Sequence, residues 1–229
     1  MDWVSFWDGA HAIYVNPRHK QIHYEKLTAD LIGYVPGPTA RVMDYGCGEA
    51  LAADRLAAAC GRLALCEAAP GVRDKLRARF GGNAKIDVLA PEEAAALPDG
   101  CQDLVIANSL VQYLSRDQFK DLLQLWHRLL APGGQLLVAD IIPPNVSAVR
   151  DAGALLSFAA KEGFLAAAVL GLARTAVSPY RKLRAELGLA HYEEAEVLAL
   201  LDAAGFTPAR VHPNVGHNQN RMAFHALRR

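Results

Sequence analysis

Short apolar runs alternate with longer amphipathic segments from residue 41 onward. This alternation is typical of βαβ units arranged around a parallel sheet. The apolar runs predict strands over Arg41–Tyr45, Arg62–Glu67, Lys85–Leu89, Asp103–Asn108 and Gln135–Ile142. The segments rich in Ala, Leu and Arg predict helices over Glu49–Cys60, Gly71–Phe80, Pro91–Leu97 and Arg116–Leu130. The pattern therefore predicts an α/β fold with a doubly wound sheet.

The alternation stops at Pro143-Pro144-Asn145 and resumes near Tyr192. The intervening residues read as a helical insertion that caps a substrate site. After the insertion, the pattern predicts a helix over Glu193–Ala204 and a hairpin of two strands, Pro208–His212 and Arg221–Leu227. The expected organisation has four parts: an N-terminal lid segment with a helix over Arg18–Ile32 (1–40), an α/β core (41–142), the helical insertion (143–191), and a helix and hairpin that complete the sheet (192–229).

Composition and charge exclude several classes of protein. The 229 residues include 24 Lys and Arg and 24 Asp and Glu, so the chain offers no net positive charge to phosphates, and nucleic acid is not expected as a partner. The most apolar stretch, Gly163–Ala173, has about half of the roughly 20 residues that a membrane-spanning helix needs, which argues against stable membrane insertion. Four cysteines without a CxxC pair, and an N-terminus without the pattern of a signal peptide, predict a cytoplasmic protein.

The most informative segment is the turn after the first predicted strand, Asp44-Tyr45-Gly46-Cys47-Gly48. Glycines at such a turn let a ligand approach the backbone closely. Leu51 stands where the dinucleotide fingerprint requires a third small residue, and the Asp44 carboxylate would repel a pyrophosphate. The segment therefore favours a cationic ligand without phosphate, such as S-adenosylmethionine (SAM).

Two further acids follow predicted strands. Glu67 ends the second strand, 23 residues after Asp44, at a position that accepts hydrogen bonds from ribose hydroxyls in doubly wound sheets. Asp87, followed by Val88, is expected to bring a carboxylate or neighbouring backbone group to the adenine amino group. Because parallel strands end at the same edge, the three acids are expected to converge on one crevice.

With these motifs, the sequence resembles the class I SAM-dependent methyltransferases over about residues 35–142. The resemblance rests on the segment from Asp44 to Gly48, on Glu67, Asp87, the strand 103–108 and the turn 130–134. It implies a Rossmann-like sheet of seven strands with the last antiparallel, helices on both faces, and SAM over the first two strand ends. The residues expected to contact SAM are Asp44, Tyr45, Gly46, Cys47, Gly48, Glu67, Ala68, Asp87, Val88 and Asn108, with Tyr14 and Arg18 of the lid near the SAM carboxylate.

Few catalytic groups are expected, because methyl transfer from a sulfonium needs mainly a positioned nucleophile and, for some substrates, a base. Tyr113, after the fourth strand, and His217, in the last loop, are the candidates. The segment Ser109, Gln112, Tyr113 lacks the acids and histidine of metal-assisted relatives and the motif of enzymes that methylate planar amino groups. No bound metal is expected, since His19 and His23 have no acidic or cysteine partner.

The sequence predicts a methyltransferase that acts on an oxygen or nitrogen atom of a small, lipophilic or aromatic metabolite. Two alternatives are an oxidoreductase that uses NAD(P), disfavoured by Asp44 and Leu51, and a SAM-binding module without activity. The apolar surface of the insertion fits a packed helix pair, a hydrophobic substrate pocket, a homodimer interface or a transient membrane contact. The basic run Tyr180–Arg184 fits a solvated helix face or a site for an anionic group.

Overall fold

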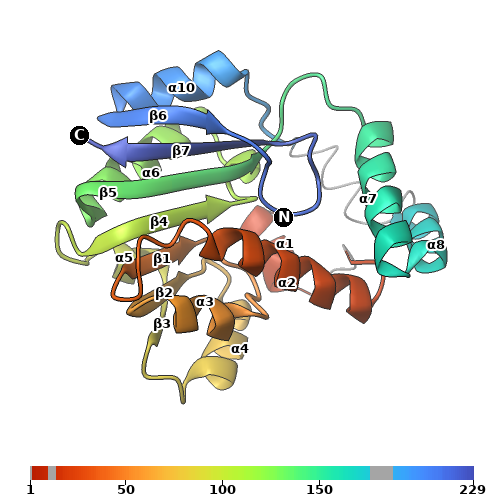
Figure 1. Ribbon diagram of the computed structural model, residues 1–229, viewed down its shortest axis with the longest axis horizontal. Coiled ribbons are helices and arrows are strands. Elements are labelled where there is room, and N and C mark those ends of the chain that lie inside the picture. The colour runs from red at the N-terminus through yellow and green to blue at the C-terminus, as the bar shows by residue number, and fades with distance from the viewer. Residues whose placement is uncertain (1, 10–13, 176–187) are drawn as a thin grey trace.

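The chain folds around one seven-stranded sheet, seen in a computed structural model that describes residues 2–9, 14–175 and 188–229 (Figure 1). The strand order is β3-β2-β1-β4-β5-β7-β6. Neighbouring strands from β3 to β5 run parallel, and β7 pairs antiparallel with both β5 and β6. The strands are β1 (Arg41–Tyr45), β2 (Arg62–Cys66), β3 (Ile86–Leu89), β4 (Gln102–Asn108), β5 (Leu130–Ile141), β6 (Phe206–Val211) and β7 (Met222–Arg228).

Helices cover both faces of the sheet. On one face, α2 (Pro17–Ile32), α3 (Ala53–Ala59) and α4 (Pro70–Phe80) contribute Leu31, Leu56 and Leu76 to one buried cluster. On the other face, α6 (Arg116–Leu129) and α10 (Glu194–Ala203) contribute Trp126 and Leu201 to a second cluster. The short helices are α1 (Trp3–Asp8), α5 (Pro91–Ala95) and the 3-10 turn η1 (Val111–Tyr113). The predicted seven-stranded α/β fold with an antiparallel last strand is confirmed.

Most predicted elements occur, with shifted ends. The helix predicted from Glu49 begins only at Ala53, because the residues before it form the turn that carries Gly46 and Gly48 at positive φ. The fifth strand begins at Leu130 rather than Gln135, because Leu130 pairs with Gln102 before a register shift in the β4–β5 ladder. The third strand ends at Leu89, as predicted.

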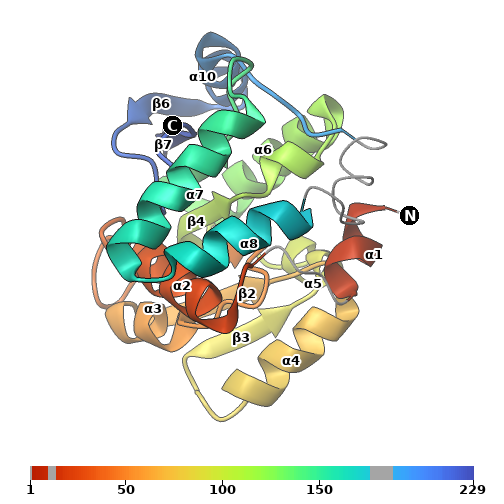
Figure 2. The ribbon, with the colours of Figure 1, turned by 90° about the vertical axis from the view of Figure 1, so that its right-hand side faces the viewer.

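The insertion forms two helices, α7 (Ala148–Glu162) and α8 (Leu165–Thr175), joined at Gly163 in a left-handed conformation. Figure 2 shows α7, α8 and α2 together in front of the carboxyl edge of the parallel strands. Phe158, Ala159, Phe164 and Ala168 form a small buried cluster on which Val15 and Ile22 pack. The two helices are thus packed in part on the N-terminal segment, although Val149, Leu165, Val169 and Leu170 are exposed.

The structure bears on three further expectations for the insertion only in part. No helix among the described residues has the length and apolar character needed to cross a bilayer. The basic run Tyr180–Arg184 lies outside the described residues. The homodimer interface stays a prediction.

Candidate active site

The turn Gly46–Gly48, here called the glycine loop, is fixed by backbone hydrogen bonds to the neighbouring strand. The amides of Gly46 and Cys47 both donate to the carbonyl of Cys66, at 2.8 and 3.2 Å. Gly46 has φ +78°, and a Cβ there would lie 3.1 Å from the side chain of Leu110, which packs over the loop. Glycine is needed at this position because another residue would be strained and would meet Leu110.

Glu67, directly after β2, holds the glycine loop with its carboxylate. One oxygen, Oε2, accepts from the Gly48 amide at 2.9 Å, and the other accepts from the Ala69 amide at 2.9 Å. The residue is buried. Because each carboxylate oxygen has two lone pairs, Glu67 can also accept a hydrogen bond from a ligand hydroxyl on either oxygen.

Asp44 lies beside the glycine loop on β1, without a basic partner among the described residues. Burial and the nearby Glu67 carboxylate raise the pKa of Asp44 to about 7. A half-buried acid with such a raised pKa is stabilised in its ionised form when a cation approaches. The side chain therefore suits a positively charged ligand, as its place in the sequence predicts.

The N-terminal segment covers the glycine loop through two tyrosines. The Tyr24 hydroxyl accepts from the Glu49 amide at 3.2 Å and from the Tyr14 hydroxyl. Burial raises the pKa of Tyr14 well above its usual value and that of Tyr24 to about 12, so both phenols stay protonated. Lys20 on α2 also forms an ion pair with Glu49 at 2.5 Å. Tyr14 thus lies near the loop as a lid would.

Arg18 points elsewhere. Its guanidinium donates to the carbonyl of Glu162, at 2.9 and 3.2 Å, at the end of α7. This contact satisfies a terminal helix carbonyl and ties α2 to the insertion. The structure does not bring Arg18 toward the glycine loop, so its predicted role at a SAM carboxylate is unsupported.

The prediction for Asp87 needs a correction. Asp87 lies in the interior of β3, and both of its oxygens bind the guanidinium of Arg62, at 2.6 and 2.8 Å. Arg62 is the first residue of β2, so the pair lies toward the amino end of the strands. The strand ends at Leu89, as predicted, but its carboxyl edge lies beyond Asp87, which the sequence predicts at that edge. Asp87 therefore does not join Asp44 and Glu67.

The remaining predicted cofactor residues lie in different surroundings. The Tyr45 ring is buried against Trp126, at 5.5 Å between ring centroids, so only its backbone faces the loop. Burial raises the pKa of the Cys47 thiol well above its usual value, which excludes a thiolate nucleophile at neutral pH. Ala68 is exposed beside Glu67, and Val88 is half-buried in β3.

Tyr113, one of the two predicted catalytic residues, packs against α1. Its ring lies 4.6 Å from that of Trp3 and 5.6 Å from that of Trp7, between centroids. These contacts position the N-terminal helix on the turn after β4. The structure gives Tyr113 a packing role, and its catalytic role stays a prediction.

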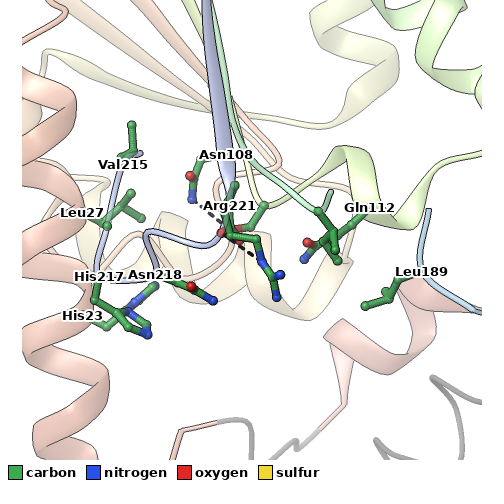
Figure 3. A pocket seen from close by; sticks show the side chains of 13 residues that line it. His23, Leu27, Asn108, Gln112, Leu189, Val215, His217, Asn218 and Arg221 are labelled. Carbon is green, nitrogen blue, oxygen red and sulfur yellow. Dashed lines mark hydrogen bonds and ion pairs between the residues drawn. The ribbon is translucent and has the colours of Figure 1, made fainter. Parts of the chain in front are cut away.

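The second candidate, His217, lines a pocket of about 130 Å³ next to the glycine loop, here called the Arg221 pocket. Figure 3 shows His23 and His217 on one side, Gln112 and Leu189 on the other, and the Arg221 guanidinium between them. Asn108, at the end of β4, also lines the pocket, and its Oδ1 has no hydrogen-bond partner among the described residues. Leu110, which directly follows the pocket residues Asn108 and Ser109 in sequence, packs on Gly46. The two sites therefore lie side by side at one sheet edge.

The polar wall of the Arg221 pocket comes from residues that sequence reasoning missed. Ser109 donates to Asp140 Oδ2 at 2.6 Å, Arg221 Nη2 donates to Asp151 Oδ2 at 2.7 Å, and Arg221 Nε lies 3.8 Å from Asp140 Oδ1. Both Ser109 and Asp140 have positive φ, and a register shift in the β5–β7 ladder falls at Asp140. Such irregularities concentrate at functional sites because they re-aim side chains. One available signal was that Asp140 lies near the carboxyl end of a predicted strand, as Asp44 does.

The histidines beside the pocket are uncharged at neutral pH. Burial, with the neighbouring His217, lowers the pKa of His19 to about 4 and that of His23 to about 3. Burial and the positive charges of Lys26 and Arg221 lower the pKa of His217. His217 stacks on Phe158 at 4.7 Å, and His19 stacks on Phe164 at 5.1 Å. These rings form an aromatic wall, and no cluster suited to a metal ion occurs in the described part of the chain.

Comparison with known proteins agrees with this geometry. Residues 42–134 match the family described as a methyltransferase domain. Within the chain, residues 42–134 are therefore similar to a methyltransferase domain, as the motifs of the sequence imply. An uncharacterized methyltransferase of Mycobacterium tuberculosis strain H37Rv is 31% identical over 131 residues, which are 57% of this chain and 64% of that protein. The aligned region thus spans about two thirds or less of either protein.

Solved structures share the fold of this chain. Magnesium protoporphyrin IX methyltransferase of Synechocystis PCC 6803, with bound SAH, has a TM-score of 0.62 at 15% identity, over 98% of this chain and 92% of that one. The [4+2]-cyclase SpnF has a TM-score of 0.57 at 16% identity, over 89% of this chain and 80% of that one. At these identities the likeness concerns the fold.

Proposed function

We propose that this protein transfers a methyl group from SAM to an oxygen or nitrogen atom of a small metabolite. The observation that carries the proposal is the half-buried carboxyl group of Asp44, which stands beside the glycine loop without a basic partner among the described residues. The sulfonium and ammonium groups of SAM would lower the pKa of this carboxyl group and favour its ionised form, whereas a pyrophosphate would be repelled by it. The alternative of an NAD(P)-dependent oxidoreductase is thereby disfavoured.

In this proposal the residues of β1 and β2 hold the cofactor. Asp44 faces the positively charged amino acid part, Glu67 accepts from the ribose hydroxyls, and the glycine loop lets the ligand approach the backbone. Tyr14 and Tyr24 close the site from the N-terminal segment. SAM supplies an activated methyl group, and the protein orients the acceptor in line with it and keeps water away.

Calorimetric titration with SAM, SAH, NAD⁺ and NADP⁺ tests the proposal. Binding of SAM and SAH, with neither dinucleotide bound, is the expected result. Binding of NAD⁺ or NADP⁺ without binding of SAM or SAH would overturn the assignment. Transfer of label from methyl-labelled SAM to a metabolite extract then measures activity directly.

A SAM-binding module without methyl transfer is the second candidate. One observation favours keeping it, since a protein of similar fold is described as a [4+2]-cyclase. Fold alone does not fix the chemistry of a site. SAM binding with no label transferred in any extract fraction would favour this candidate.

A further inference from the structure

The Arg221 pocket has a defined set of hydrogen-bonding groups that the cofactor does not use. Arg221 is 8% exposed, and its Nη1 has no hydrogen-bond partner among the described residues. The adjacent Nη2 is fixed on Asp151 at 2.7 Å. A buried guanidinium nitrogen without a partner is costly, so Nη1 is a donor available to a ligand.

Asp140 offers the matching acceptor. Its Oδ2 accepts from Ser109, whereas Oδ1 lies 3.8 Å from Arg221 Nε, beyond hydrogen-bond distance. Nε and Nη1 belong to the same guanidinium group, so the open acceptor Oδ1 and the open donor Nη1 are neighbours. A ligand that pairs with both must present a donor hydrogen and an acceptor oxygen on adjacent positions.

The charge balance argues against an anionic ligand. Of the described residues that line the pocket, Arg221 alone carries a positive charge, and two carboxylates, Asp140 and Asp151, already face it. His23 and His217 are uncharged at neutral pH. A ligand anion would therefore meet a surplus of negative charge. The two imidazole rings give the pocket planar surfaces, and Leu27, Ile142, Leu189 and Val215 give it apolar ones, which together suit an uncharged molecule with a planar, apolar body.

We infer that the Arg221 pocket binds an uncharged, planar methyl acceptor with a hydroxyl group next to a second oxygen, and that Asp140 is the base that takes the hydroxyl proton. This inference rests on the proposed function and names its substrate class. The acceptor oxygen forms a bond to the methyl carbon, the bond from that carbon to sulfur breaks with its electron pair left on sulfur, and the hydroxyl proton moves to Asp140 Oδ1. Arg221 Nη1 holds the second oxygen, and Ser109 is a positioning residue.

The protonation of Asp140 supports this role. Burial raises its pKa to about 6, against the opposing effects of the Ser109 hydrogen bond and the Arg221 charge. The groups that face Asp140 are Ser109 after β4, Arg221 before β7, Asp151 on α7, His217 in the β6–β7 loop and His23 on α2. A base with a pKa near the working pH transfers protons effectively.

Catechol, phenol and benzoate are suitable probes for the full-length protein saturated with SAH. Catechol carries the adjacent pair of oxygens, phenol lacks the second, and benzoate is an anion. Catechol is expected to bind about five times more tightly than phenol, because it makes one more hydrogen bond, and benzoate is expected to bind most weakly. Equal binding of catechol and phenol, or tighter binding of benzoate, would overturn the inference.

Asp140→Asn is the variant that tests the base. Asn tolerates the positive φ of Asp140, and unchanged SAH affinity reports an intact fold. With SAM and catechol, we expect the wild type to form the monomethyl ether at a rate that rises with pH through about 6, and the variant to be about 100-fold slower without this pH dependence. Ser109→Ala removes a hydrogen bond to the carboxylate and should move the inflection to higher pH. Asp103→Asn, at the remote Arg41 pair, is the control.

The outcomes separate this inference from the proposed function. Failure of the wild type to bind SAH or SAM would contradict the proposed function itself. Cofactor binding without a preference for catechol, with no product from bound catechol, or with an undiminished rate in Asp140→Asn, would overturn the inference alone.

Discussion

The glycine loop and the Arg221 pocket lie next to each other at one edge of the sheet, yet they are built differently. The glycine loop is held by backbone amides, with Cys66 and Glu67 on the next strand as its partners. The Arg221 pocket is held by side chains from α2, the turn after β4, the end of β5, the β6–β7 loop and α7. Backbone geometry fixes the first site and side-chain choice fixes the second.

This difference explains how one fold can serve many acceptors. A change of side chain in the Arg221 pocket leaves the strand ladders intact, so acceptor preference can change without loss of the cofactor site. Residues of the glycine loop have no such freedom, because they shape the backbone itself. The same contrast predicts that variants of the two sites have different effects on cofactor affinity and on stability.

The largest expected effect comes from Glu67→Ala. Both oxygens of Glu67 bind backbone amides that would be left without partners, at a cost of about 3 kcal/mol in the free energy of unfolding. SAH affinity should fall by about 100-fold or more, since the loop and the ribose partner are lost together. Chemical unfolding and calorimetry measure the two effects. Asp87→Asn is the matched control, because Asp87 pairs with Arg62, and a comparable loss of SAH affinity there would restore the original prediction for Asp87.

Asp44→Asn should separate binding from stability. The pKa of Asp44 in the folded protein, about 7, is above its unfolded value, so ionisation destabilises the cofactor-free protein as pH rises from about 4 to 7. The variant should therefore be about 1–2 kcal/mol more stable than the wild type at pH 8 while it binds SAM about 30-fold more weakly. Wild-type SAM affinity should rise with pH through about 7, and the variant should show no such rise. An unchanged pH profile in the variant would contradict the role assigned to this carboxyl group.

Sequence reasoning predicted the sheet and the glycine loop because both depend on local patterns. Strand periodicity, glycine spacing and an acid beside the turn are visible in a few consecutive residues, so these patterns predict a place for Asp44 and Glu67 beside the glycine loop. Asp87 was misplaced although the strand end at Leu89 was predicted, because its pairing with Arg62 of the neighbouring strand is not visible in such patterns. The partners in the Arg221 pocket, Asp140 and Arg221, are 81 positions apart in sequence (221 − 140) and meet only through the β5–β7 pairing.

Gly171→Ala tests how the insertion depends on the N-terminal segment. A Cβ at Gly171 would lie 2.2 Å from Val15 Cγ1 and 3.3 Å from the Val15 backbone, so α8 would have to move away. Overpacking of this kind costs about 2 kcal/mol, which thermal unfolding would detect. SAH affinity should change less than catechol affinity, because α8 lies on the acceptor side. Gly153→Ala is the control, since nothing lies within 4 Å of its Cβ position on α7, and it should be neutral or slightly stabilising.

The smallest effect is expected from His19→Phe, which changes how the free energy of unfolding depends on pH. The pKa of His19 in the folded protein, about 4, is below its unfolded value, so stability is fully present above about pH 6.5 and is lost as the pH falls toward 4. Between pH 7 and pH 5, protonation linked to His19 lowers the free energy of unfolding of the wild type by at most about 2 kcal/mol. The variant lacks this group, so its free energy of unfolding should fall by up to about 2 kcal/mol less over the same pH range. Urea unfolding at the two pH values measures the difference. Phe164→Leu removes the stacking partner of His19 but keeps the histidine, so it should lower stability at both pH values and leave the acid sensitivity in place. If His19→Phe and the wild type lose the same stability between pH 7 and pH 5, groups other than the His19 imidazole cause the acid sensitivity.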